Sequence, residues 1–294
     1  MESLKTCTLC PRNCKVNRLE GMVGRCMAGV KPKIALADLY FYEEPCISGK
    51  EGSGTVFFTG CNLSCKFCQN YKISQEFAGK EIDVKDLATK FLELQEKGAN
   101  NINLVTGFMF VPQIIEALKI AKLNGLNIPI VYNTSSYESV DTLKMLDGFI
   151  DIYLPDLKYT YDELAYTLSD VKDYFTMTKL ALKEMKRQVD GKMIFDNRGM
   201  LKRGMIVRHL VLPNHLQNSK KALKWIRDNL GKDTYVSIMA QYFPCYKAME
   251  DKDIGRKITY EEYDEICKYF EALGLYNGYI QEIEEYEEKY VPKF

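Results

Sequence analysis

The chain has 294 residues, which suffice for one large domain or two small ones. Its 40 basic and 40 acidic side chains balance, so it lacks the positive charge that nucleic-acid binding requires. The N-terminal residues form no apolar signal segment, and no apolar run is long enough to cross a bilayer. We therefore expect a soluble, cytoplasmic protein with neither a nucleic-acid nor a membrane partner.

Residues 1–50 are dense in cysteine, glycine and proline and predict a small N-terminal module. Most of the ten cysteines fall early in the chain at ligand-like spacings, which without an export signal favours metal over disulfides. Four of them have the spacing C-x2-C-x3-C-x11-C: Cys7, Cys10, Cys14 and Cys26. Zinc and a second iron–sulfur cluster both accept four thiolates, so the metal stays open. Cys46 is a fifth candidate ligand.

From residue 54 onward, apolar runs typical of strands alternate with helical patterns. The predicted strands are 55–59, 101–106, 128–133, 149–155, 205–212 and 234–241. Helices are predicted within 83–98, 111–125, 138–146, 161–189 and 219–230, and a capping box of Thr259 and Glu262 begins a last one. Several strands are apolar on both faces, as in a parallel sheet covered by helices. Periodicity alone leaves a barrel and a flat doubly wound sheet as alternatives, and both bind ligands at the carboxyl ends of the strands.

The loop after the first of these strands carries Cys61, Cys65 and Cys68, spaced C-x3-C-x2-C. A loop this short brings three thiolates to adjacent corners of a four-iron cluster. The fourth iron then has no protein ligand and can bind a small molecule, whereas a site for electron transfer alone is normally closed by a fourth cysteine. The three cysteines are therefore the candidate catalytic and cluster-binding residues.

This motif, with the aromatic Phe67 before its last cysteine, resembles the signature of the radical S-adenosylmethionine (radical SAM) superfamily. More narrowly, the chain resembles the pyruvate formate-lyase activating enzyme-like, PflX-type branch. The segments that carry this resemblance are 7–14, 21–26, 43–49, 60–70, 103–106, 151–158 and 207–213. It implies an α/β fold, an incomplete (β/α)6 TIM-like barrel in residues 51–245. The Cys-rich module 1–50 would precede the barrel, and a C-terminal helical extension 246–294 would follow it.

The resemblance also implies the cofactors and the reaction. A [4Fe-4S] cluster would bind S-adenosylmethionine (SAM) and cleave it reductively to a 5′-deoxyadenosyl radical, which abstracts hydrogen from a substrate. The electron would come from a donor such as flavodoxin or ferredoxin. The implied enzyme is an oxidoreductase that activates a glycyl radical enzyme, and modification of a peptide or a small molecule is the alternative. A non-catalytic iron–sulfur or metal-binding electron-transfer protein is a second alternative, which the open three-cysteine signature disfavours.

Signature and strand-end residues are the further candidates for cofactor binding. The resemblance assigns this role to Phe67, Asn70, Thr106, Gly107, Asn133, Thr134 and Ser135. Thr106-Gly107-Phe108 stands where activating enzymes carry Gly-Gly-Glu for the SAM amino group, so the glutamate is missing here. Asn133 begins a segment that resembles the ribose-contacting Asp-Thr-Asn-Gly, with asparagine in place of the aspartate.

Charged residues complete the candidate site. Asp156 and Lys158 end a nearly all-apolar strand, where charge is costly without a partner, solvent or ligand, so they either hold the cofactor or pair with each other. Arg208 and His209 lie in one strand, and alternation sends them to opposite faces. Because a guanidinium suits the carboxylate of SAM or of a substrate, we expect Arg208 to face the barrel interior and His209 the core.

Overall fold

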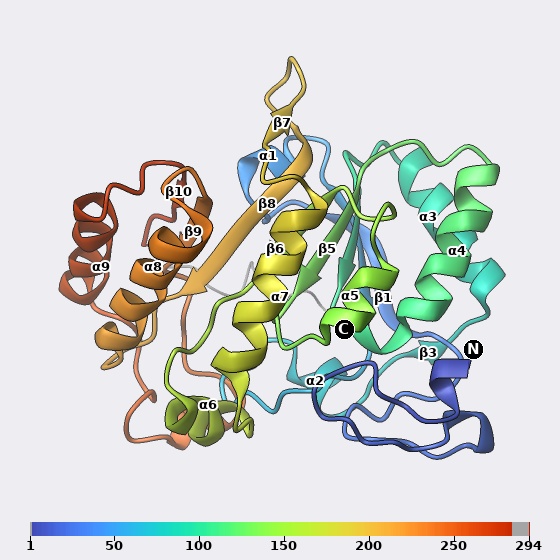
Figure 1. Cartoon of the computed structure of the whole chain (residues 1–294), viewed down its shortest axis with the longest axis horizontal. Coiled ribbons are helices and arrows are strands. Elements are labelled where there is room, and N and C mark those ends of the chain that lie inside the picture. The colour runs from blue at the N-terminus through green and yellow to red at the C-terminus, as the bar shows by residue number, and fades with distance from the viewer. Residues whose placement is uncertain (1, 284–293) are drawn as a thin grey trace.

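The computed structural model describes residues 2–283 and 294. Its centre is a sheet with the strand order β10-β9-β8-β6-β5-β4-β2-β1-β3, which forms an incomplete barrel (Figure 1). Its six central strands run parallel: β2 (Ser53–Phe58), β4 (Ile102–Val105), β5 (Ile130–Thr134), β6 (Ile152–Pro155), β8 (Leu201–Leu210) and β9 (Tyr235–Met239). These are the six strands predicted from the sequence, so the predicted barrel is confirmed.

Further strands extend the sheet at both ends. Strand β1 (Lys33–Tyr40) pairs antiparallel with β2, β3 (Lys80–Glu81) pairs antiparallel with β1, and β10 (Gly278–Ile280) pairs parallel with β9. Strand β1 therefore belongs to the sheet, although its residues fall within the predicted N-terminal module. Strand β10 lies in the predicted helical extension, and residues 284–293 of that extension are outside the described part. A two-residue strand, β7 (Ile194–Phe195), forms a hairpin with the start of β8.

Helices cover the outer face of the barrel (Figure 1). They are α3 (Val84–Glu96), α4 (Val111–Leu123), α5 (Val140–Met145), α6 (Asp162–Ser169), α7 (Tyr174–Gln188), α8 (Leu216–Leu230) and α9 (Tyr260–Ala272). The capping box of α9 is confirmed, because Glu262 N–H donates to Thr259 Oγ1 at 3.2 Å and the Glu262 carboxylate accepts from the Thr259 N–H. None of the described helices is both long and apolar enough to cross a membrane.

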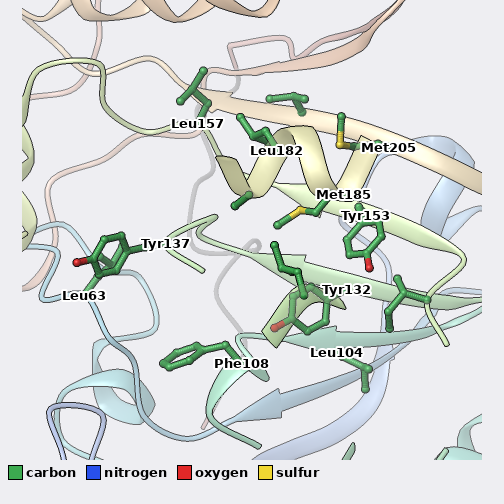
Figure 2. Close-up of a cluster of buried hydrophobic side chains, with 14 of the residues drawn as sticks. Leu63, Leu104, Phe108, Tyr132, Tyr137, Tyr153, Leu157, Leu182, Met185 and Met205 are labelled. Carbon is green, nitrogen blue, oxygen red and sulfur yellow. The ribbon is translucent and has the colours of Figure 1, made fainter. Parts of the chain in front are cut away.

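The main core lies between the sheet and these helices. Leu182 and Met185 of α7 face Tyr132 of β5 and Tyr153 of β6 (Figure 2), and all four side chains are fully buried. Burial of a large apolar side chain stabilises the fold by about 1.5–3 kcal/mol. This packing fixes the strands, and with them the positions of the loops at their carboxyl ends.

A smaller cluster fills the inside of the barrel. The short helix α1 (Pro45–Ser48) places Cys46 and Ile47 against Val131, Ile152, Leu154, Leu201 and Ile206, which point inward from the strands. Cys46 is 4% exposed and lies in this apolar cluster. The structure therefore removes Cys46 from the candidate ligands of the N-terminal metal.

Candidate active site

The carboxyl ends of the parallel strands and the signature loop line one cavity of about 600 Å³. The predicted residues in its lining are Cys61, Cys65, Phe67, Cys68, Asn70, Thr106, Asn133, Thr134, Ser135, Asp156, Lys158 and Arg208. Gly107 is not among the lining residues. A Cβ at Gly107 would lie 2.7 Å from Cδ1 of Ile114, so the glycine serves the packing of α4 against the strand end.

The signature loop is anchored to its surroundings. Two of its backbone N–H groups donate to the end of α6, Ser64 to the Ser169 carbonyl at 3.0 Å and Lys66 to the Leu168 carbonyl at 2.8 Å. The Phe67 ring packs edge-on against Tyr242 with 5.7 Å between centroids, and Asn70 precedes the short helix α2 (Tyr71–Ser74). These contacts anchor the loop that carries the cysteines.

Each signature thiol has a polar partner. Leu63 N–H donates to Cys61 Sγ at 3.4 Å, Ser169 Oγ–H donates to Cys65 Sγ at 3.0 Å, and Ser74 Oγ lies 3.2 Å from Cys68 Sγ. Burial raises the pKa of all three thiols, to about 12 for Cys68, so iron binding must displace their protons. These are the only cysteines among the described lining residues of the cavity. The set fits a [4Fe-4S] cluster with one open iron.

Thr106 ends β4 in a strained backbone conformation. Its φ of 57° lies in the left-handed region, which β-branched residues rarely adopt. Its N–H donates to the Asn133 carbonyl at 2.9 Å, which ties the ends of β4 and β5 together. Strain of about 1–3 kcal/mol per residue concentrates at functional sites. The position of Thr106 in the cavity lining agrees with such a site.

At the end of β5, the side chain of Thr134 makes hydrogen bonds within the protein. The Thr134 hydroxyl donates to the Glu138 carboxyl group and accepts from the N–H of Ser136 at 3.1 Å. The Ser135 carbonyl accepts from the hydroxyl of Tyr174 at 2.7 Å. Thr134 therefore shapes the turn, and Ser135 is among the residues that line the cavity.

Glu138, behind β5, is 2% exposed, and its Oε2 lacks a hydrogen-bond partner within the described structure. Burial raises the pKa of Glu138 from 4.5 to about 7, although hydrogen bonds from Thr134 and Tyr132 oppose the shift. Because the folded-state pKa is the higher one, this group stabilises the fold fully below its unfolded pKa. That contribution is lost as the pH rises through the folded pKa.

We expect the wild-type protein to lose roughly 3 kcal/mol of stability through Glu138 between about pH 4.5 and pH 8. The Glu138→Gln variant should lack this loss. Glutamine keeps the shape of the protonated acid and does not titrate. Urea unfolding at both pH values measures the effect, and the difference between the two proteins isolates Glu138 from other groups that titrate in this range. Identical pH dependence in both proteins would contradict the prediction.

Asp156 and Lys158 form an ion pair with 2.5 Å between Oδ2 and Nζ, and each side chain is 19% exposed. Both line the cavity, so pairing with each other and proximity to a ligand occur together. Burial alone would lower the pKa of Lys158, but the Asp156 carboxylate raises it above its usual value. Lys158 thus provides positive charge beside the signature thiols.

The alternation predicted for β8 is confirmed. Arg208 lines the cavity, whereas His209 is fully buried on the opposite face. The ring nitrogens of His209 lie 2.6 Å from the Leu157 carbonyl and 2.8 Å from Ser219 Oγ. Burial lowers the pKa of His209 to about 4, so the ring is neutral at pH 7 and belongs to the core.

The guanidinium of Arg208 is enclosed by two carboxylates. Its Nη2 lies 2.5 Å from Glu43 and also pairs with Glu44, and its Nε donates to Glu44 at 2.9 Å. Glu43 accepts further hydrogen bonds from the side-chain amides of Asn103 at 2.7 Å and Asn133 at 3.3 Å. Burial favours the neutral acid, but Arg208 outweighs it and lowers the pKa of Glu44. Arg208, which was predicted to bind the carboxylate of SAM or of a substrate, is therefore already paired with carboxylates of the protein itself.

Sequence reasoning assigned no role to Glu43 and Glu44. The signals were two adjacent acids directly before Pro45 and the place of residues 43–49 among the segments that carry the family resemblance. Their partner Arg208 lies 165 positions from Glu43 along the chain, so the pairing itself left no local pattern.

Comparisons with known proteins show which proteins this chain is similar to. A family model described as the radical SAM superfamily matches residues 55–238. The uncharacterized protein MJ0674 of Methanocaldococcus jannaschii is 34% identical over 286 residues, covering 92% of this chain and 76% of that protein. The pyruvate formate-lyase-activating enzyme of Clostridium pasteurianum is 28% identical over 116 residues, covering 37% of this chain and 46% of that protein.

The fold is also found among solved structures. The FeFe-hydrogenase maturase HydG from Carboxydothermus hydrogenoformans superposes with a TM-score of 0.52 at 14% identity, covering 78% of this chain and 53% of that chain. The chain thus spans about half the length of that protein, and the likeness concerns the fold. Because the family model matches more than half of the sequence and includes the signature loop, the chain belongs to the radical SAM superfamily.

Proposed function

We propose that this enzyme cleaves SAM reductively and directs the 5′-deoxyadenosyl radical to a hydrogen atom of its substrate. One observation carries the proposal: Cys61, Cys65 and Cys68 line the same cavity as the strand ends predicted to bind SAM, without a fourth cysteine in the described lining. When bound, the cluster supplies an open iron for SAM and the electron that breaks the sulfonium C–S bond. The protein supplies orientation, burial and charge.

The strand ends are proposed to hold SAM across the mouth of the barrel. Thr106 offers its hydroxyl group to the amino group, in place of the missing glutamate. Asn133 and Ser135 line the cavity and offer polar groups to the ribose hydroxyls. Lys158 offsets the negative charge of the cluster thiolates. A one-electron donor protein such as flavodoxin or ferredoxin completes the system.

We further propose that the substrate is a protein, namely a glycyl radical enzyme. Phe41 and Tyr42 line the cavity and are 50% and 46% exposed, so the rim presents aromatic rings to solvent. Aromatic residues are enriched at protein interfaces. The similarity to the activating enzyme of Clostridium pasteurianum supports the same choice. A glycine-containing segment of the partner would enter the cavity past this rim.

The test is anaerobic reconstitution of the cluster, followed by incubation with SAM and dithionite. We expect 5′-deoxyadenosine, detected by liquid chromatography. A glycyl radical should appear in the EPR spectrum when a candidate partner enzyme is added. Cluster-loaded protein that yields no 5′-deoxyadenosine would refute SAM cleavage. If 5′-deoxyadenosine forms but no candidate partner gains a radical, SAM cleavage stands and the activating role is refuted.

A further inference from the structure

A second, much smaller cavity lies within the N-terminal module. It has a volume of about 20 Å³, and all four cysteines of the first motif line it: Cys7, Cys10, Cys14 and Cys26. The turn at Gly24 allows this arrangement, because a Cβ at Gly24 would lie only 3.0 Å from both Cβ and Sγ of Cys14. The fold therefore gathers the four thiols around a common space.

Arg18 is an independent sign of an anionic ligand. It is 1% exposed, lines the small cavity and lies with its guanidinium 5.6 Å from the ring centroid of Phe110. Its hydrogen bonds go to the carbonyls of Gly29, at 2.9 Å from Nε, and Met109, at 2.7 Å from Nη1. Among the described residues, no carboxylate pairs with it. A buried charge without a counter-charge costs several kcal/mol, and a metal centre with four thiolates would supply the missing negative charge.

We propose that the four cysteines bind a second [4Fe-4S] cluster, which passes electrons to the first. A single zinc ion holds each sulfur at about 2.3 Å, which leaves no space between the thiols, whereas a cluster core fills such a space. No group of three or more His, Cys, Asp or Glu side chains in the described part of the chain is arranged around a single ion.

The contacts of the module place this cluster directly behind the signature loop. A Cβ at Gly60, the residue before Cys61, would lie 2.3 Å from the Cys26 carbonyl oxygen. Arg12 Nε donates to the Asn62 carbonyl at 2.9 Å. On the other side Cys14 is exposed and accessible to a donor protein. One electron from a reduced flavodoxin-class donor enters there and reduces the second cluster, which then reduces the first and returns to its oxidised state. This relay rests on the proposed function, whereas cluster binding does not.

Cluster binding is tested in the full chain with Cys61, Cys65 and Cys68 all replaced by alanine. After anaerobic reconstitution this variant should retain about four iron and four sulfide per chain, against about eight of each in the wild type. Loss of all iron from this variant, or retention of zinc without sulfide, would overturn the proposal. Cys267→Ala, on α9 and outside both cavities, should keep the wild-type content of both elements.

The relay is tested with Cys14→Ala, which removes the exposed ligand and keeps the three half-buried ones, Cys7, Cys10 and Cys26. With a flavodoxin-class donor, 5′-deoxyadenosine formation should slow by about tenfold or more, while with dithionite it should stay within about twofold of the wild-type rate. If the rate of 5′-deoxyadenosine formation by Cys14→Ala, relative to the wild type, is the same with both reductants, the relay is overturned. Absence of 5′-deoxyadenosine from the wild type itself would refute the proposed function and leave the iron count as the test of the second cluster.

Discussion

Replacing Cys65 with alanine should abolish 5′-deoxyadenosine formation. Cys65 is 8% exposed and lies at the centre of the signature, where Ser169 donates to its sulfur and Lys158 provides nearby positive charge. Two remaining thiolates do not hold a cluster with three protein-bound irons. Chromatography of the products, after reduction with dithionite in the presence of SAM, should find no product above the background without enzyme.

The matched control is Cys267→Ala, which removes a half-buried thiol of α9 that lies outside the cavity. It should keep the wild-type rate within about twofold, because surface and peripheral substitutions change stability by less than about 1 kcal/mol. Iron analysis of both variants separates loss of the cluster from loss of the fold. Wild-type activity in Cys65→Ala would show that the signature cysteines do not hold the catalytic cluster.

Arg208→Met should lower the free energy of unfolding by about 3–5 kcal/mol, because it leaves two buried carboxylates without a counter-charge. The Arg208 side chain is 9% exposed, and those of Glu43 and Glu44 are 8% and 6% exposed. Methionine fills much of the volume of the arginine stem, so the change reports mainly on charge. The midpoint of urea unfolding, measured on the protein without SAM, should fall accordingly.

Arg187→Met is the control for this experiment. Arg187 also pairs with two carboxylates, Asp147 and Glu184, but its side chain is 55% exposed. Water and salt screen such a pair, so we expect a loss of less than about 1 kcal/mol. Equal losses in the two variants would mean that the acid pair in the barrel is hydrated, and would contradict the buried-charge account.

Periodicity found the elements that have strong local patterns. The six apolar strands and the capping box of α9 are present, and the predicted helix 161–189 divides into α6 and α7. Strands β1 and β10 were not predicted, because neither is a continuous buried apolar run: β1 is half-buried along its length, and β10 has only three residues at the edge of the sheet. Their places in the sheet depend on β2 and β9, which lie elsewhere in the sequence.

The sequence by itself determined the three-cysteine signature, because one short loop carries all three thiols and their spacing is a property of the local chain. It also determined that Arg208 and His209 face opposite sides, since alternation along a strand is local. Only the tertiary structure decided that Glu43 forms an ion pair with Arg208, because residues 165 positions apart meet only when the barrel forms. Burial then makes the pairing strong, since the charges lose water and must satisfy one another.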